Sequence, residues 1–237
     1  DMLRAHGQSH AFGVSVMEAV RVGIDGFAGE IYSSSTVREA LREGKPRRAA
    51  ALLGHWWTIS GHVVSGDQRG RTIGFATANI ELGDRIEPKL GVYAVRLIVT
   101  DAPHVGTLAA QAQSGSEVPE VGRVYAGVAN LGKRPTFDKR DTLLEVHVLD
   151  AAPDLYGRHV RVELVGFIRA ERKFDGLDAL KAQITDDVVT ARTVLADPEN
   201  ARERLTLPRL EDYLARTPTP PAQLQTGQPH RAGVQSE

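Results

Sequence analysis

Residues 142–149 read Thr-Leu-Leu-Glu-Val-His-Val-Leu, and from the second leucine onward apolar and polar side chains alternate. Successive side chains of a β-strand point to opposite faces, so the apolar residues share one face while Glu145 and His147 share the other. A carboxylate in the middle of such a strand is costly unless it is paired or solvated. A barrel mouth would solvate Glu145 and let it act as a general base, whereas an ordinary solvent-facing strand position explains it equally well.

The same period of two continues on both sides of this stretch. Gly, Pro and Asp turns separate the alternating segments, and no helical period lies between them. This pattern predicts a six-stranded antiparallel barrel or a sandwich. Residues 101–122 contain few large apolar side chains, and we expect them to form a mobile hairpin loop. The predicted strands are 57–65, 75–80, 91–99, 123–130, 142–149 and 159–168.

One long helix is predicted after the strands. Apolar residues recur every three or four positions from Leu177 to Leu195, and Asp175 is placed to cap the start of this helix. Two shorter helices are predicted before the strands. The first follows the hydroxyl-rich run 33–36 and ends at Gly44, and the second runs from Pro46 to Leu53.

The N-terminal residues predict a short α/β piece, with a helix ended by Gly7 and strands near 12–16 and 20–24. Two short strands cannot bury their own faces, so this piece is expected to depend on other parts of a protein.

Composition places the chain among ordinary globular proteins. It has 237 residues, of which 41% are hydrophobic and 25% charged, with a formal net charge of −1. The balanced charge gives no sign of a nucleic-acid partner. No cysteine is present, and neither a long apolar run nor a signal-peptide pattern occurs, so we expect a cytoplasmic protein with no membrane partner.

A glycine-rich stretch is the first candidate for binding chemistry. Gly66, Gly70 and Gly74 are spaced by four, with Arg69 and Arg71 between them, so backbone N–H groups there could approach a polyphosphate. On spacing alone, a glycine-bearing hairpin is the more common explanation.

Thr77 and Asn79 are the second candidate, because they lie two apart on a predicted strand and therefore project to one face. A hydroxyl and a carboxamide suit Mg²⁺ that takes most of its ligands from phosphates and water. The commoner alternative is a pair of strand-end polar residues. The run 130–137, taken alone, predicts a turn between two strands.

In this order, the segments resemble the riboflavin kinase domain of bacterial bifunctional riboflavin kinase/FMN adenylyltransferases, the FAD synthetases. The resemblance covers roughly residues 50–195. It rests on the stretches 66–79 (Gly-Asp-Gln-Arg-Gly-Arg-Thr-Ile-Gly-Phe-Ala-Thr-Ala-Asn), 91–93 (Gly-Val-Tyr), 127–137 (Gly-Val-Ala-Asn-Leu-Gly-Lys-Arg-Pro-Thr-Phe), 144–147 (Leu-Glu-Val-His), 155–157 (Leu-Tyr-Gly), 167–174 (Phe-Ile-Arg-Ala-Glu-Arg-Lys-Phe) and 180–184.

The resemblance implies a six-stranded antiparallel barrel with a C-terminal helix, which transfers the γ-phosphate of ATP to the 5′-hydroxyl of riboflavin to give FMN. It implies Glu145 as the base and Thr77 and Asn79 as holders of the Mg²⁺ that accompanies ATP. The alternative is a flavin- or nucleotide-binding module without catalysis. The remaining implied contacts are Gly66, Asp67, Gly70, Arg71, Gly74 and Thr77 for the nucleotide, and Arg169, Glu171 and Phe174 for the flavin.

One position departs from the family pattern, which usually has Pro-Thr-Ala-Asn where this chain has Ala76-Thr77-Ala78-Asn79. Losing a proline that fits its site removes about 0.4–1 kcal/mol of stability. It removes no ligand, so we expect activity to be retained.

The run 32–38 (Tyr-Ser-Ser-Ser-Thr-Val-Arg) resembles the end of the family's adenylyltransferase domain. The upstream nucleotide-binding strand of that domain is absent from the 237 residues, so we expect no complete adenylyltransferase site in this chain. The expected boundaries are 1–38 for the end of a nucleotidyltransferase domain, 39–54 for a helical connector, 55–200 for the kinase domain, 201–216 for a short helical segment and 217–237 for a disordered tail.

Overall fold

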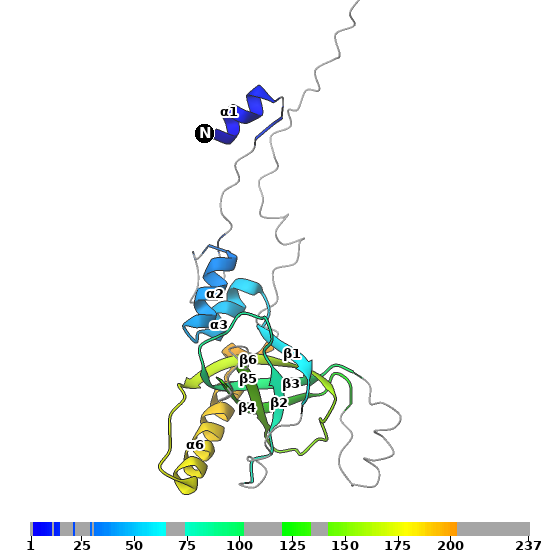
Figure 1. Ribbon diagram of the computed structural model, residues 1–237, viewed down its shortest axis with the longest axis vertical. Helices are drawn as coiled ribbons and strands as arrows, with labels where there is room; N and C mark the ends of the chain where they lie inside the picture. Colours follow the sequence, from blue (N-terminus) through cyan, green and yellow to red (C-terminus); the bar gives the residue numbers. More distant parts are fainter. Residues whose placement is uncertain are drawn as a thin grey trace, which may run out of the picture. The chain divides into compact units, whose positions relative to one another are not determined.

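The computed structural model describes residues 2–10, 12–14, 21, 29, 31–64, 74–101, 120–133 and 142–202 (Figure 1). Six strands and a long C-terminal helix dominate this part of the chain. In chain order the elements are α1 (Met2–Ser9), α2 (Ser34–Arg42), α3 (Pro46–Leu53), β1 (Thr58–His62), β2 (Ala78–Glu81), β3 (Gly91–Val99), β4 (Val124–Lys133), β5 (Thr142–Val148), β6 (His159–Arg169), α6 (Leu177–Ala196) and the 3₁₀ turn η1 (Pro198–Asn200).

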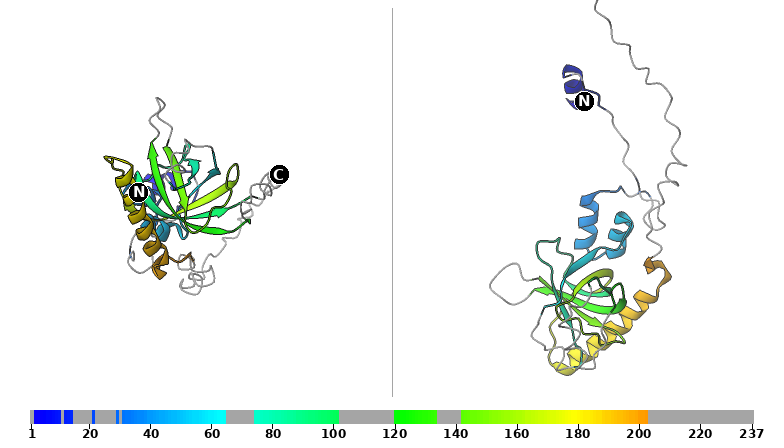
Figure 2. Two further views of the ribbon diagram at one scale, coloured as in Figure 1. Left: turned by 90° about the horizontal axis from the view of Figure 1, so that it is seen from below. Right: turned by 90° about the vertical axis from the view of Figure 1, so that its right-hand side faces the viewer.

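The strands form one sheet in the order β1-β6-β3-β4-β5-β2, and every neighbouring pair is antiparallel. The sheet curls until its two edges meet, as the views in Figure 2 show. At the meeting point Val64, just after β1, forms a single bridge with Asn79 of β2, and its N–H donates to the Asn79 carbonyl oxygen at 2.9 Å. The result is a nearly closed barrel, which confirms the predicted fold class.

The interior of the barrel is apolar. Alternate residues of each strand point inward, so that Leu144, Val146 and Val148 of β5 pack with Tyr93 and other buried side chains of the remaining strands. This confirms the two faces predicted for residues 142–149. Burial of this continuous apolar cluster is the main force that holds the strands in register.

Helix α6 covers part of the outer face of the sheet (Figure 1). Ala191 and Val188 of α6 pack against Val92 and Ala94 of β3 and Val128 of β4. The helix has the predicted bounds to within one residue at its C-terminal end. The predicted cap is wrong, because the N-cap position is Gly176 and no side chain caps the helix there.

The two helices before the barrel confirm the pattern of residues 33–54. The Ser33 side chain accepts a hydrogen bond from the Thr36 N–H at 3.1 Å and caps α2. Pro46 occupies the first turn of α3, and Gly54 ends that helix with a φ of 74°, a conformation that favours glycine. The helices pack on each other through Leu41 and Leu52.

The N-terminal expectation is partly wrong. Helix α1 continues through Gly7 to Ser9, and residues 12–14 belong to no strand. A Cβ at Gly7 would lie 2.6 Å from the carbonyl oxygen of Phe12, so the glycine serves close packing of the following chain rather than ending the helix. The rest of both predicted N-terminal strands, apart from Arg21, lies outside the described residues, as do 102–119, 203–216 and the tail 217–237.

Candidate active site on the outer face of the barrel

A row of three polar side chains crosses the sheet on its outer face. Asn79 of β2 is the direct ladder partner of Glu145 on β5, and Glu145 is the direct partner of Asn130 on β4. Direct partners on adjacent strands project from the same face of a sheet. Their neighbours Leu144 and Val146 fill the interior, so this row faces outward. The structure therefore gives Glu145 an exposed position on the outer face.

Asn79 and Glu145 stand close together because of how the barrel closes. The backbone carbonyl of Asn79 accepts from Val64, so it points away from β5. Asn79 and Glu145 therefore form a non-hydrogen-bonded pair, the kind whose side chains stand closest in an antiparallel ladder.

Asn79 is only 5% exposed, and among the described residues its Oδ1 atom has no hydrogen-bond partner. A buried acceptor without a partner is costly, so such an atom suggests a ligand that the protein binds. Thr77, two residues earlier, is exposed. Among the described residues no three His, Asp or Glu side chains cluster as metal ligands. The neutral oxygen atoms of Asn79 and Thr77 fit Mg²⁺ that is held mainly by phosphates and water.

The chain just before β2 is attached to β5 by His147. Its Nδ1 atom lies 2.9 Å from the carbonyl oxygen of Ala76, and its ring packs edge-on against Phe75 with centroids 5.2 Å apart. Ala76 replaces the family's proline, and its carbonyl, which a proline would also have, is the group in contact. Residues 75–77 therefore precede the ladder of β2 instead of extending it as predicted.

Glu171, in the segment after β6, joins the polar row. The Asn130 Nδ2 atom donates to Glu171 Oε1 at 3.3 Å. Gly132, next to Asn130 on the same face, leaves the space for this carboxylate, because a Cβ there would collide with Glu171 Oε1. The structure thus brings Glu171 to the same row as Glu145.

Arg169, at the end of β6, is held by α6. Its Nε and Nη2 atoms donate to the Asp187 carboxylate at 2.9 and 2.7 Å, and its Nη1 donates to the Ala170 carbonyl at 3.1 Å. All three nitrogen atoms of this guanidinium therefore have protein partners. These contacts fix the chain that leads to Glu171, while a direct flavin contact of Arg169 stays a prediction.

Phe174 lies in contact with two arginines. The guanidinium carbons of Arg169 and Arg172 lie 5.6 and 4.8 Å from its ring centroid, within the range of cation–π contact. Arg172 also donates to Gln183, which in turn donates to Asp187 at 2.8 Å. Phe174 is partly buried, and its predicted flavin contact stays a prediction.

Four of the predicted nucleotide contacts, Gly66, Asp67, Gly70 and Arg71, lie outside the described residues. Gly74 is described and has a φ of 92°, which a residue with a side chain rarely adopts. It begins the exposed segment that leads to Thr77.

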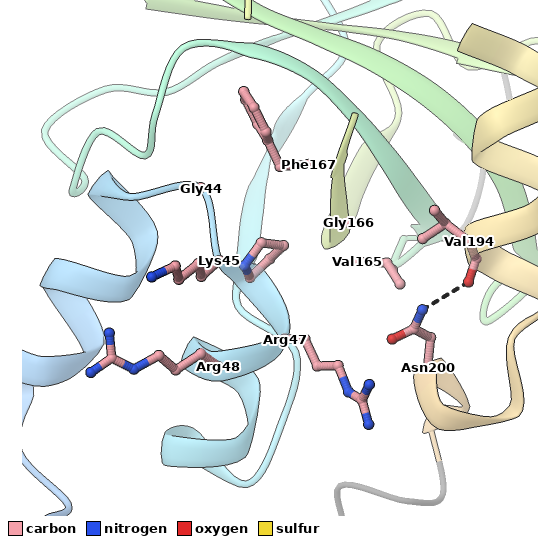
Figure 3. Close-up of a pocket in the computed structure, with 10 residues that line it drawn as sticks. Gly44, Lys45, Arg47, Arg48, Val165, Gly166, Phe167, Val194 and Asn200 are labelled. Carbon is pink, nitrogen blue, oxygen red and sulfur yellow. Dashed lines mark hydrogen bonds between the residues drawn. The ribbon is translucent and has the colours of Figure 1, made fainter. Parts of the chain in front are cut away.

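A cavity of about 600 Å³ lies away from this row (Figure 3). It opens between the start of α3, the middle of β6, α6 and η1. Val165, Phe167 and Val194 give it an apolar wall, and none of the predicted site residues lines it. Figure 3 shows the charged ends of Lys45 and Arg48 pointing away from Val165 and Gly166.

Three residues of this site were missed as individual candidates. Asn130 is the last residue of the predicted strand 123–130 and the first of a run that predicts a turn, whereas β4 continues to Lys133, and only the pairing of β4 with β5 reveals its place beside Glu145. Asp187 and Gln183 lie on a helix whose pattern marks them as polar, and no local signal shows what they contact.

These features define a six-stranded β-barrel domain with an outward-facing polar site beside a covering helix. A sequence profile described as "Flavokinase: Riboflavin kinase" matches residues 53–195. The chain belongs to the riboflavin kinase family.

Several relatives carry the name bifunctional riboflavin kinase/FMN adenylyltransferase, and two of them illustrate the similarity. The protein from Escherichia coli (strain K12) is 41% identical over 191 residues, which are 81% of this chain and 53% of the relative. The protein from Bacillus subtilis (strain 168) is 37% identical, over 74% of this chain and 54% of the relative. The chain spans about half the length of the curated relatives it matches.

A solved structure also matches this fold. A crystal structure described as a macrolide-efflux protein from Streptococcus pneumoniae has a TM-score of 0.57 and 33% identity, covering 73% of this chain and 50% of the other. Among the described residues of the present chain, no helix has both the length and the apolar character needed to span a bilayer.

Proposed function

We propose that this domain transfers the γ-phosphate of ATP to the 5′-hydroxyl of riboflavin and releases FMN and ADP. Family membership supports both substrates. The observation that carries the proposal is the outward-facing row in which Asn79 and Glu145 are direct neighbours. A carboxylate beside a carboxamide oxygen that has no partner among the described residues suits a site where a hydroxyl loses its proton next to a metal-bound phosphate.

In the proposed reaction, Glu145 accepts the proton of the riboflavin 5′-hydroxyl. The 5′-oxygen forms a bond to the γ-phosphorus, and the bond between that phosphorus and the β,γ-bridging oxygen breaks, so ADP leaves. Glu145 is exposed on the outer face, so a substrate can reach it without opening the barrel.

Asn79 and Thr77 would hold Mg²⁺ through their neutral oxygen atoms. When bound, the ion would neutralise charge on the ATP phosphates, which is the main chemical requirement of phosphoryl transfer. The buried Oδ1 atom of Asn79, which has no partner among the described residues, supports this role.

The flavin would lie on the other side of Glu145, toward the segment after β6. Glu171 reaches the row through Asn130, and the Phe174 ring contacts both Arg169 and Arg172. An aromatic ring and a carboxylate in the segment after β6 suit a ligand with a flat ring system and a hydroxylated chain. The predicted phosphate contacts at Gly66, Asp67, Gly70, Arg71, Gly74 and Thr77 belong to the same proposal.

A direct assay tests the activity. The purified chain is incubated with riboflavin and MgATP, and FMN is followed by chromatography, with one control lacking ATP and one containing a chelator. We expect FMN only in the complete reaction. A folded sample that binds riboflavin tightly and forms no FMN would favour the alternative, a binding module without catalysis.

The adenylyltransferase activity in the relatives' name is a separate question. Incubation with FMN and MgATP, followed by chromatography of FAD, tests it without affecting the first assay. We also propose a cytoplasmic location with small molecules as substrates, which the absence of cysteine and the balanced charge support.

A further inference from the structure

We propose that His147 is a positioning residue for the nucleotide side of the site, because it fixes the chain immediately before Thr77. This inference rests on the proposed kinase function. It assigns a role to a side chain that stands on the same face of β5 as Glu145 but takes no part in the proton transfer.

The first step of the argument is where the β2 ladder begins. Ala78 pairs with Val146 and is the first residue of β2, so Thr77 lies just outside the ladder, at the level of His147. From Ala78 onward the pairing with β5 sets the position of the backbone. Before Ala78 another contact has to set it.

His147 supplies that contact twice. Its Nδ1 atom lies 2.9 Å from the carbonyl oxygen of Ala76, and its ring meets Phe75 edge-on at an interplanar angle of 79°. Along the chain, Thr77 therefore lies between Ala76, which contacts His147, and Ala78, the first residue of the β2 ladder. Fixing both sides of an exposed residue reduces the number of backbone conformations it can adopt.

The contact also determines where the imidazole proton lies. A carbonyl oxygen only accepts hydrogen bonds, so Nδ1 of His147 carries the proton and donates it to Ala76. In the neutral ring Nε2 is then an acceptor. The role needs a donor at the Nδ1 position and does not need a charge, which separates it from a role in acid–base chemistry.

Two substitutions distinguish these roles. His147→Asn keeps an N–H donor near the Nδ1 position and cannot titrate, whereas His147→Leu removes the donor. We expect His147→Leu to raise the KM for ATP about five- to tenfold, the effect of losing about one hydrogen bond, with little change in the KM for riboflavin. We expect His147→Asn to stay within about threefold of the unsubstituted protein.

His62 provides a matched control. Its Nδ1 atom faces the carbonyl oxygen of Gly157 at 3.2 Å, and its ring meets His159 edge-on at 5.0 Å, so it makes the same two kinds of contact at a site on β1. We expect His62→Leu to leave the KM for ATP unchanged.

A binding measurement makes the test independent of turnover. Calorimetric titration of the same proteins with MgADP should show weaker binding for His147→Leu and near-normal binding for His147→Asn. An unchanged KM and MgADP affinity in His147→Leu would overturn the proposal, and so would a His147→Asn variant as impaired as His147→Leu. If the unsubstituted protein forms no FMN, the proposed function fails, while the MgADP titrations still test the role of His147.

Discussion

The carboxylate of Asp187 on α6 accepts hydrogen bonds from two nitrogen atoms of Arg169 at the end of β6, with Nε at 2.9 Å and Nη2 at 2.7 Å. Asp187 is buried, and Gln183 donates a further hydrogen bond to it at 2.8 Å. This arrangement ties the last barrel strand to the covering helix at the point where the chain turns toward Glu171.

Replacing Asp187 by Ala should destabilise the fold and weaken flavin binding together. The change leaves the Arg169 guanidinium without its carboxylate, and breaking a buried pair in this way costs roughly 3 kcal/mol. Urea denaturation measures the loss, and the KM for riboflavin should rise while that for ATP changes less. Asp186→Ala is the matched control, because Asp186 is the exposed neighbour on the same helix. Equal stability of the two variants would contradict the assignment.

Replacing Glu145 by Gln should reduce catalysis without affecting the fold. The amide keeps the size of the side chain but cannot accept the hydroxyl proton, and general-base catalysis is typically worth about 10²- to 10⁴-fold in rate. Steady-state kinetics should therefore show a lower kcat, with KM values close to those of the unsubstituted protein. Glu120→Gln changes an exposed carboxylate in the turn before β4 and should have no effect. Full turnover by Glu145→Gln would contradict the assignment of Glu145 as the general base.

Replacing Asn79 by Leu should separate stability from function. Because Oδ1 of Asn79 is buried with no partner among the described residues, its removal should change the free energy of unfolding by no more than about 1 kcal/mol. The Mg²⁺ concentration needed for half-maximal turnover should rise. Thermal unfolding and a magnesium titration measure the two effects. A large loss of stability with an unchanged Mg²⁺ requirement would show that the residue is structural.

Asp101 should make the stability of the barrel depend on acidic pH. Burial raises the pKa of Asp101, but hydrogen bonds from the His159 backbone N–H and from Arg158 outweigh it, so the pKa of this carboxyl lies below its usual value of 3.8. The stabilisation is therefore complete above the unfolded-state pKa and is lost as the pH falls through the folded-state pKa. Asp101→Asn should be less stable than the unsubstituted protein at neutral pH, and the difference should shrink near pH 3.

Asp150 is the control for this prediction. Its hydrogen bond to Arg192 also lowers its pKa, but the pair is exposed to solvent and should contribute little. Asparagine tolerates the φ of 59° at this position, so Asp150→Asn adds no backbone strain. Denaturation at neutral and acidic pH should show the larger pH effect only at Asp101.

The fold could be predicted from the sequence because its signals are local. The alternation in β5 depends only on neighbouring residues, and so do the Ser33 cap and the Gly54 end of α3. Gly7 does not end α1, because a glycine within a helix costs only about 1 kcal/mol, which other contacts can offset.

The site could be predicted only in part, because some of its contacts join residues that are far apart in the sequence. Thr77, Asn79 and Glu145 belong to recognisable motifs, but which residue stands opposite Glu145 depends on the pairing of β5 with β4. That pairing brings Asn130 into the row, and Glu171 follows through it. The contact between Arg169 and Asp187 joins two elements by packing, which no periodicity within either element reveals.

Asn79, the proposed metal ligand, also forms the bridge with Val64 at which the two edges of the sheet meet. Opening the cylinder at this edge breaks the hydrogen bond from Val64 and moves the backbone that carries the proposed metal ligand. A ligand that binds Asn79 more tightly when the barrel is closed must therefore stabilise the closed barrel. The stabilisation equals the difference between the ligand's binding free energies for the closed and the open barrel. If Asn79 holds the metal as proposed, binding of the nucleotide and closure of the β-sheet are coupled through this residue.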